Sequence, residues 1–457
     1  MRNNLPMSDS ESIQMQIEHV KKRVNDAMTM AKTLGADGAE VAMSRQQGLS
    51  VSTRMGEVEN VEFTNDGGLG ITVYKDGRKG SASTADLSEK ALKQAIEAAV
   101  NIAKYTSVDE CSGMADKDRL AMAPEDLDLY HPKVLTTEQA ISLAKACEDT
   151  ALGYDKRITN SDGATLASFE GFKVYGNTHG QLVGYPSTRH SLSCVMIANE
   201  GDDMQRDYAY TVSREFDAME SAAKIGQQAS IEALSRLGAR KLSTTKVPVM
   251  FRADIANTLF GHFIAAISGG NLYRKSSFLM DSIGKQVFPE FLSISERPHL
   301  KKALASSAFD AEGVATVDRE IITDGSLATY LLTSYSARKM GLKTTGHAGG
   351  IHNWQLGMKD KGQGGDFDAM LKTLGTGLLV TELMGQGVNV VTGDYSRGAA
   401  GFWVENGEIA YPVDEITIAG KLQDIFSGIV AIGNDTDMRG SIRTGSVIVN
   451  EMQVAGS

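Results

Sequence analysis

Apolar residues recur every three or four positions in several segments of the first half of the chain, as they do along one face of an amphipathic helix. The first helix is expected from about residue 10 to 34, because Gly35 follows it as a stop signal. Further helices are predicted at about residues 88–105, 137–151 and 213–237. The first half of the chain therefore predicts four amphipathic helices.

Between these helices the apolar residues alternate with polar ones, which is typical of half-buried strands. Residues 38–84 contain VENVEF and LGITVY with turns at NDGG and KDGRKG, and these predict an antiparallel meander. ATLASFEGFKVYGN and LVGYPSTRHSLSCVMIANE predict further strands of the same kind. The order helix, meander, helix thus occurs twice, over about residues 10–105 and 137–237. We interpret it as a possible internal duplication.

The pattern of apolar and polar residues changes near residue 241, where the predicted strand VPVMF precedes a predicted helix over residues 253–268. One apolar stripe on this helix comprises Ala256, Leu259, Phe260, Phe263, Ile264 and Ile267. From Val314 onward, short alternating strands and glycine turns favour a curved antiparallel sheet or a barrel-like sandwich. We therefore predict an α+β fold, with an N-terminal α+β domain over residues 1–240 and a β-rich C-terminal domain over residues 241–457.

Length and charge narrow the possible functions. At 457 residues the chain exceeds the size at which one hydrophobic core keeps growing, so two or three cores are expected. The hydrophobic fraction of 42% and the charged fraction of 23% are those of an ordinary globular protein. A net charge of -11 opposes binding to a phosphate backbone, because lysine and arginine must replace the counterions there. We expect no nucleic-acid partner.

No run of about 18 apolar residues is present, and the start MRNNLPMSDSES lacks the apolar core of a signal peptide. We therefore expect no membrane association and a cytoplasmic location. The cysteines Cys111, Cys147 and Cys194 are odd in number and widely spaced, without a CxxC pair. They indicate neither a disulfide framework nor a thiolate zinc cluster.

Several common catalytic motifs are absent from the sequence. GGNLYRKSS is the nearest approach to a phosphate-binding loop, but Arg274 occupies the position of the required second glycine. DYSRG has Asp394 in place of the first glycine of a serine-hydrolase elbow. None of the eight histidines is followed by glutamate, which excludes the standard helical zinc-peptidase motif.

Histidines are dense in the glycine-rich segment TTGHAGGIHNW, which places His347 and His352 five residues apart. One interpretation is that the two imidazoles converge on one metal ion. Glycine loops also use histidine for backbone hydrogen bonds or contact with a peptide, so both interpretations stay open. His262 lies away from the apolar stripe of its helix, and we interpret it as a hydrogen-bonded residue on the polar flank.

Three acidic residues lie among the predicted C-terminal strands. Asp394 and Glu405 are interpreted as turn-capping or solvent-exposed residues. Glu382 lies inside VTELMG among apolar neighbours, so its burial requires a partner such as Arg397 or backbone amides. A carboxylate in such surroundings is a candidate functional residue.

Two long segments resemble the PmbA (TldE) branch of the TldD/PmbA metallopeptidase family. They are GTGLLVTELMGQGVNVVTGDYSRGAAGFWVENGEIAYPVDEITIAGKL and GHFIAAISGGNLYRKSSFLMDSIGKQV. The resemblance runs nearly the full length and implies an α+β N-terminal region followed by a β-rich domain. It also implies a two-subunit protease, in which a TldD-type chain supplies zinc and the PmbA-type chain completes a chamber for unfolded peptides. Family roles include trimming a microcin precursor, degrading an antitoxin and modulating gyrase.

The resemblance further implies where a zinc site would lie. In TldD-type relatives the helix after the VPV-like strand carries H-E-x-x-x-H, and a late cysteine completes the site. An ungapped match places these positions at Phe260, Gly261 and Ala265, and a match shifted by one residue places them at Gly261, His262 and Ala266. No cysteine follows Cys194. We therefore assign this chain no catalytic residue, metal ligand or cofactor, and expect zinc in the TldD partner.

Three hypotheses follow from the sequence. The first is a noncatalytic peptidase subunit with a TldD-type partner, working as a homo- or heterodimer on unfolded peptides. The second is an autonomous metallopeptidase using His347, His352 and an acid such as Glu382. The third is a non-proteolytic regulatory protein acting on a toxin–antitoxin or gyrase pathway. For the first hypothesis, the candidates for peptide contact are His347, His352, Glu382, Gln386, Asp394 and Arg397.

Overall fold

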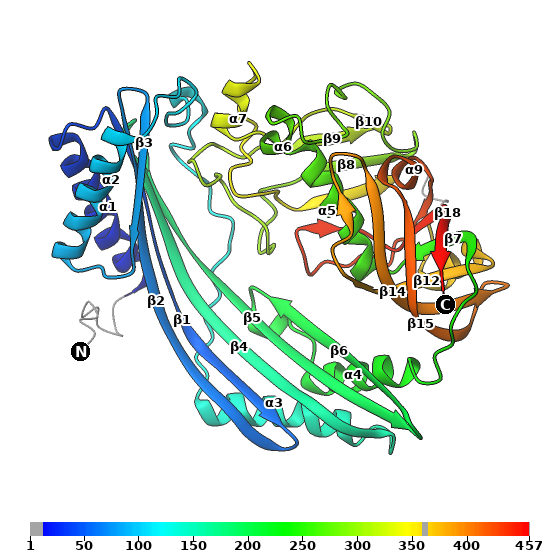
Figure 1. Cartoon of the computed structure of the whole chain (residues 1–457). Coiled ribbons are helices and arrows are strands. Elements are labelled where there is room, and N and C mark those ends of the chain that lie inside the picture. Colours follow the sequence, from blue (N-terminus) through cyan, green and yellow to red (C-terminus); the bar gives the residue numbers. More distant parts are fainter. Residues whose placement is uncertain (1–11, 359–363, 457) are drawn as a thin grey trace.

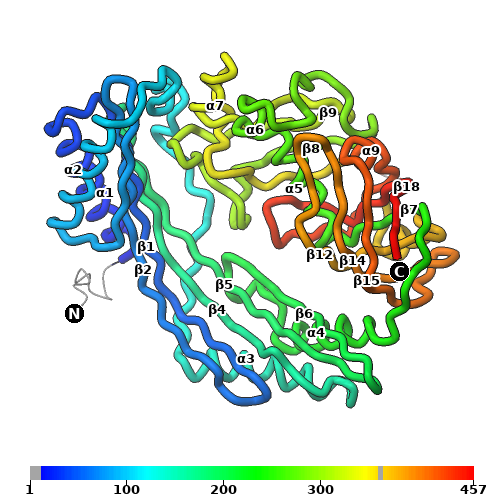
Figure 2. The backbone as a smooth tube through the Cα atoms, viewed as in Figure 1, coloured from blue at the N-terminus to red at the C-terminus, as the bar shows by residue number. Residues whose placement is uncertain are grey.

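The chain folds into a long, curved antiparallel sheet that faces a separate β-rich region (Figure 1). The structure is a computed structural model that describes residues 12–358 and 364–456, so the expected helix start at residue 10 lies outside the described part. Figure 2 traces the chain from the sheet, through the bend at α4, into the C-terminal region. Helices and strands occur in both halves, which confirms the predicted α+β class.

The N-terminal sheet contains six strands in the order β3-β2-β1-β4-β5-β6, with every neighbouring pair antiparallel. The strands are β1 (Gly38–Arg54), β2 (Glu57–Lys75), β3 (Arg78–Thr84), β4 (Ile158–Asn177), β5 (Leu182–Glu200) and β6 (Asp203–Ser213). Asp76 and Gly77 form the predicted turn between β2 and β3. Both have positive φ, as two-residue hairpin loops that match the strand twist require.

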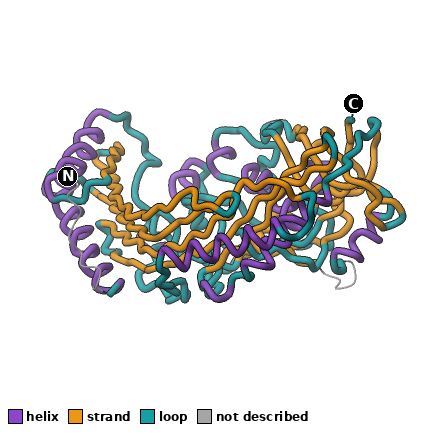
Figure 3. The backbone as a smooth tube through the Cα atoms, turned by 90° about the horizontal axis from the view of Figure 1, so that it is seen from below, coloured by secondary structure: helices purple, strands orange, loops and turns teal. Residues whose placement is uncertain are grey.

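Four helices cover one face of this sheet: α1 (Ile13–Thr33), α2 (Glu89–Tyr105), α3 (Thr137–Leu152) and α4 (Ala222–Ser235). Val41 and Met43 of β1 pack in the cluster under α1 and α2, whereas Leu49 and Val51 pack in the cluster under α3 and α4. Odd-numbered residues of β1 share one face, so both helix pairs lie on the same side. Figure 3 shows helices along the outside of the long strands.

The elements α1-β1-β2-β3-α2 recur in the same order as α3-β4-β5-β6-α4, and the two sets meet where β1 pairs with β4. We propose that this order reflects an internal duplication, with the N-terminal domain ending near residue 240. The predicted helix over residues 213–237 is wrong at its start. The alternating strand β6 continues to Ser213. The helix begins at Ala222, directly after its N-cap Ser221, whose hydroxyl accepts a hydrogen bond from the Lys224 amide.

The C-terminal region contains two sheets. The larger one runs β12-β7-β18-β15-β14-β13, and an additional β12–β14 pairing closes five of its strands into a ring, with β16 attached to β18. Its strands are β7 (Thr245–Phe251), β12 (Gly377–Met384), β13 (Val388–Asn389), β14 (Asp394–Glu405), β15 (Glu408–Lys421), β16 (Ile429–Ile432) and β18 (Val447–Ala455). This closure agrees with the predicted barrel-like, mostly antiparallel arrangement.

The smaller sheet has the order β10-β9-β8-β11-β17. It comprises β8 (Leu292–Glu296), β9 (Arg319–Thr323), β10 (Ser326–Leu327), β11 (Trp354–Met358) and β17 (Ile442–Arg443). The helices of this region are α5 (Ala253–Ile267), α6 (Gly269–Tyr273), α7 (Ser334–Lys339), α8 (Phe367–Leu374) and α9 (Leu422–Ser427). None of the helices in the described part of the chain is long and apolar enough to span a membrane.

Helix α5 is at the centre of the largest core. Phe260 and Phe263 on this helix are fully buried, and Phe263 contacts Phe288 edge-to-face with ring centroids 5.0 Å apart. Trp354 and Phe426 lie 5.9 Å from Phe263 on its other sides. Aromatic groups packed this closely contribute strongly to stability, so α5 holds the C-terminal region together.

We predict that Phe260→Asp lowers the free energy of unfolding by at least about 3 kcal/mol, because a buried ring is lost and an unpaired carboxylate is buried. Phe63→Asp is the matched control, since the Phe63 side chain on β2 is 71% exposed. Thermal and denaturant unfolding of both variants would test this. Equal melting temperatures for the two variants would contradict the assigned role of α5.

Candidate functional site

The positions on α5 that correspond to a zinc motif do not fit a zinc ion. Phe260 is fully buried and contacts Phe288, with ring centroids 6.1 Å apart. Gly261 has no side chain, and Ala265 offers no ligand atom. In the frame shifted by one residue, His262 alone supplies an imidazole. One nitrogen ligand does not make a zinc site, so the donor set at these positions of α5 is incomplete.

His262 differs from the hydrogen-bonded residue expected from the sequence. Its Nε2 is buried and has no hydrogen-bond partner among the described residues, and the same holds for the Tyr395 hydroxyl. The two rings meet edge-to-face with centroids 5.8 Å apart. Burial, and to a smaller extent the nearby Arg397 guanidinium, lower the pKa of His262. The imidazole is therefore neutral at ordinary pH and packs as an aromatic side chain.

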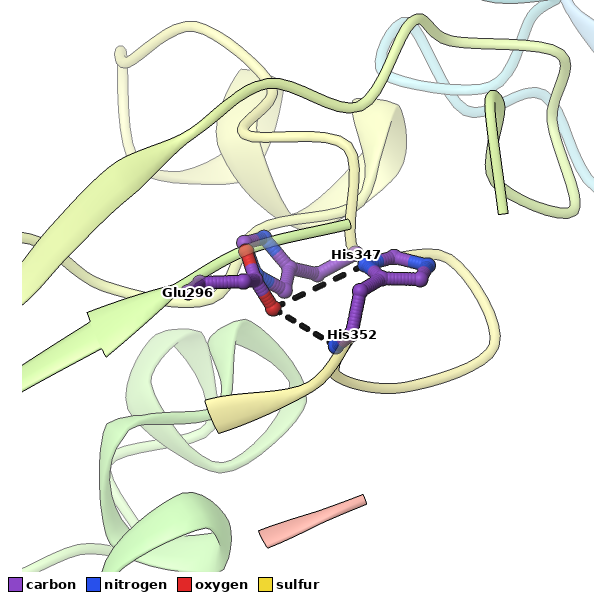
Figure 4. Close-up of side chains that lie close together, drawn as sticks. All are labelled: Glu296, His347 and His352. Atoms are coloured by element: carbon purple, nitrogen blue, oxygen red, sulfur yellow. Dashed lines mark hydrogen bonds and ion pairs between the residues drawn. The ribbon is translucent and has the colours of Figure 1, made fainter. Parts of the chain in front are cut away.

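Three buried side chains with metal-binding atoms meet at another place in the C-terminal region: Glu296, His347 and His352 (Figure 4). Glu296 ends strand β8, and both histidines lie in the loop that leads from α7 to β11. Strand pairing of Glu296 with Trp354 brings the end of this loop beside the glutamate. The structure thus unites the two histidines that the sequence singled out.

Hydrogen bonds fix the carboxylate between the two histidines. His347 Nε2 lies 2.9 Å from Glu296 Oε2, and the backbone amide of His352 donates to Oε1 at 2.7 Å. Burial alone would raise the pKa of Glu296, but the hydrogen bond with His347 and the nearby imidazole of His352 outweigh it and lower the pKa to about 2. The carboxylate is therefore ionised at neutral pH although its side chain is only 2% exposed.

The loop carrying the histidines is held by a second buried carboxylate. The Asp310 side chain accepts hydrogen bonds from the backbone amides of Ala348 at 2.9 Å and Val314 at 3.0 Å. Burial raises the pKa of Asp310 to about 6, although these amides act in the opposite direction. Gly349 and Gly350 have φ values of 104° and 128°, which side chains rarely allow. The glycines thus let the loop fold back over Glu296.

A cavity of about 840 Å³ lies between the N-terminal sheet and this loop. Its walls come from β1, β2, β4 and β5 on one side and from residues 304–311 and 348–352 on the other. His352 and Asp310 line it, whereas Glu296 and His347 lie behind them. The inner face of the sheet therefore forms one wall of a space that reaches the histidine cluster.

Glu382 lies in a different cleft, of about 680 Å³, bounded by β6, α4, β12 and the start of α5. Its Oε2 lies 2.6 Å from Arg236 Nη2, and Arg236 also binds Asp207 at 3.3 Å. The expected partner Arg397 is thus replaced by Arg236. Glu382 is therefore separate from the histidine pair, and Glu296 is the carboxylate beside that pair.

The remaining peptide-contact candidates lie at the ends of β12 and β14. Gln386 is exposed in the turn before β13. Asp394 is paired with Lys421 at 2.5 Å, and the hydrogen bond from Lys421 lowers its pKa. Arg397 donates from Nε to the Gly385 carbonyl at 3.1 Å. The contacts of Asp394 and Arg397 stabilise the turns between neighbouring strands. None of the three residues belongs to the histidine cluster.

Glu296 was missed by the sequence reasoning. The strand LSISE has the alternating pattern in which Leu292, Ile294 and Glu296 all face the core. A glutamate that alternates with the buried apolar residues of a strand must itself be buried, and it then requires hydrogen-bond or ion-pair partners. This position in the alternating pattern is the signal that could have identified Glu296. The partners themselves become visible only through the pairing of β8 with β11.

We predict that Glu296→Gln destabilises the protein at neutral pH by roughly 3 kcal/mol, the equivalent of a pKa lowered from 4.5 to about 2. A lowered carboxyl pKa stabilises the fold above the unfolded-state value and loses that effect as the pH falls. The melting-temperature difference between wild type and variant should therefore narrow below about pH 4.5.

Melting temperatures of both proteins between about pH 7 and pH 3.5 would test this. Asp310 is present in both proteins, so its raised pKa affects both alike and cancels in the difference. A difference that stays constant over this range would contradict the assigned role of Glu296.

Comparison with known proteins places the chain in a family. It matches the PmbA/TldA metallopeptidase domain 1 over residues 39–103, the central domain over residues 130–237 and the C-terminal domain over residues 244–456. It is 57% identical to metalloprotease PmbA of Escherichia coli O157:H7, covering 96% of this chain and 98% of that protein. A PmbA homolog of Haemophilus influenzae is 54% identical, over 97% of this chain and 98% of that protein.

Solved structures agree with this result. A candidate modulator of DNA gyrase from Bacteroides thetaiotaomicron has a TM-score of 0.90 and 30% identity, over 96% of this chain and 99% of that one. TldE from Thermococcus kodakarensis shares the fold, with a TM-score of 0.79 and 19% identity over 94% and 99% of the two chains. The chain therefore belongs to the PmbA/TldD metallopeptidase family, in its PmbA branch.

Proposed function

We propose that this chain is the noncatalytic subunit of a heteromeric zinc peptidase of the cytoplasm, in which a TldD-type partner holds the catalytic zinc. One observation carries the proposal. The chain matches the family along its length, yet the motif positions on α5 are Phe260, Gly261 and Ala265, which offer no ligand. The contribution of this chain is then to bind unfolded peptide and shape the chamber.

The inner surfaces suit an extended peptide. Strand β6 forms the free edge of the N-terminal sheet and borders the cleft of about 680 Å³. Tyr208 and Tyr210 on β6 stack with ring centroids 6.2 Å apart, and Tyr208 is 51% exposed. An edge strand can pair with a peptide through main-chain hydrogen bonds, which are tolerant of sequence. This tolerance is what a peptidase of unfolded chains needs.

A second candidate function is regulatory binding without proteolysis, which is supported by structural relatives described as candidate DNA gyrase modulators. The net charge of -11 disfavours direct contact with DNA, so such a role would act through protein partners. Peptide cleavage by the mixed subunits separates the two functions, because a purely regulatory chain would not change the cleavage of an unfolded peptide.

We predict that cleavage of an unfolded peptide appears only when this chain is combined with a TldD-type chain. Tyr208→Ala should raise KM with little change in kcat, because it removes binding contacts that ground state and transition state share. Tyr105→Ala is the matched control, since Tyr105 is 89% exposed at the end of α2 on the outer side of the sheet. Steady-state kinetics of both variants with the wild-type partner would test this.

Two results would overturn the proposal. One is a Tyr208→Ala effect confined to kcat, which would place β6 in the chemistry of the transition state. The other is peptide cleavage by this chain alone that disappears in His347→Ala and His352→Ala. That result would favour the autonomous metallopeptidase.

A further inference from the structure

We propose that Glu296, His347 and His352 form a binding site for a divalent transition metal ion such as Zn²⁺, away from α5. The three ligand atoms lie within 4.8 Å of one another, and all three residues are buried. Two imidazoles and one carboxylate are the protein ligands of a common class of zinc site, which leaves a fourth position open. Imidazole nitrogen also favours zinc, cobalt or nickel over magnesium or calcium.

The surroundings of His347 fit a metal ligand. Its Nδ1 lies 2.8 Å from the Thr345 hydroxyl, which accepts from the Leu332 amide at 2.7 Å and lies 3.2 Å from the Tyr330 carbonyl. When this hydroxyl donates to the carbonyl, Nδ1 carries a proton and donates to Thr345 Oγ1. The Nε2 lone pair then faces the Glu296 carboxylate at 2.9 Å, and two acceptors this close share a cation, either a proton or a metal ion.

His352 gives the second, independent observation. Its Nδ1 is buried and has no hydrogen-bond partner among the described residues, and it lies 3.6 Å from Glu296 Oε1. Its side chain is 10% exposed, so little solvent reaches the nitrogen. A buried imidazole nitrogen without a partner is unfavourable. An ion held between it and the carboxylate would satisfy both groups.

The carboxylate is positioned without help from an ion. The backbone amide of His352 donates to Glu296 Oε1, and the β8–β11 register holds Glu296 opposite Trp354. Such support orients a ligand before the metal binds. The half-buried Arg319 guanidinium also acts electrostatically on Glu296, and this positive charge moderates the affinity for a divalent ion.

The site is reached from the cavity of about 840 Å³, because His352 is the member of the cluster that lines it. An ion and a fourth ligand would enter past the imidazole of His352. A bound ion would link the loop that carries both histidines to the end of β8. It would thereby fix the part of the cavity wall formed by residues 348–352.

The test uses the full-length chain alone, after treatment with a chelator. Titration with Co²⁺ should give the visible absorption of a low-symmetry, four- or five-coordinate ion, saturating near one equivalent per chain. His352→Ala should lose this absorption. The imidazole of His352 donates no hydrogen bond to the described residues, and the variant keeps the backbone amide that binds Glu296. We therefore expect the metal-free variant to fold.

Two histidine controls locate the ion. His299→Ala changes a histidine of the same region that contacts Glu125 and Thr316, and His262→Ala changes the histidine of α5. Both should keep the cobalt spectrum. Zn²⁺ should raise the melting temperature of the wild type and of both controls but not of His352→Ala. Should His352→Ala fail to fold, His352→Phe, which fills the space of the imidazole without a ligand atom, provides the same comparison.

Unsaturable binding, or the same spectrum in His352→Ala, would overturn the proposal. The cation shared by Glu296 and His347 would then be a proton. This experiment contains neither partner nor peptide, so its failure leaves the proposed subunit function intact. Conversely, peptide cleavage by this chain alone would refute the subunit function without deciding whether an ion binds at Glu296.

Discussion

The architecture depends on one constraint: the long N-terminal sheet buries only one of its faces under helices. Val41 and Val51 lie in the same phase of β1, so both helix pairs must cover the same side. The opposite face is left for the C-terminal region, and the chain bends back toward it (Figure 1). The cavities, and the position of His352 on the wall of one of them, follow from this one-sided burial.

Local features of the fold were predictable because their determinants are close in sequence. The helix periods and the Asp76-Gly77 turn require only neighbouring residues. The pairing of β1 with β4 was not predictable, because it joins strands separated by two helices and two further strands. The start of α4 was misplaced for a related reason: Ser213 continues a strand whose partner β5 fixes its end.

The candidate site was predictable in part. The glycine-rich segment identified His347 and His352, since the loop itself brings them close, with ring centroids 6.0 Å apart. Their carboxylate was assigned to Glu382, but that residue binds Arg236, and Glu296 takes its place. Both partnerships depend on tertiary packing between distant segments. Helix α5 shows the complementary case, because the residue types at its motif positions are given by the sequence itself, whereas the unpartnered state of His262 depends on packing.

Two buried carboxylates hold the histidine loop, and their environments move their pKa values in opposite directions. The imidazoles that face Glu296 lower its pKa to about 2. At Asp310 the hydrogen bonds from backbone amides only partly offset the effect of burial, so the pKa is raised to about 6. A raised carboxyl pKa favours folding at low pH, and this contribution is lost as the pH rises through it. Mild acid therefore protonates Asp310 while Glu296 keeps its charge. The loop is then held against β8 by the histidine cluster, independently of the charge on Asp310.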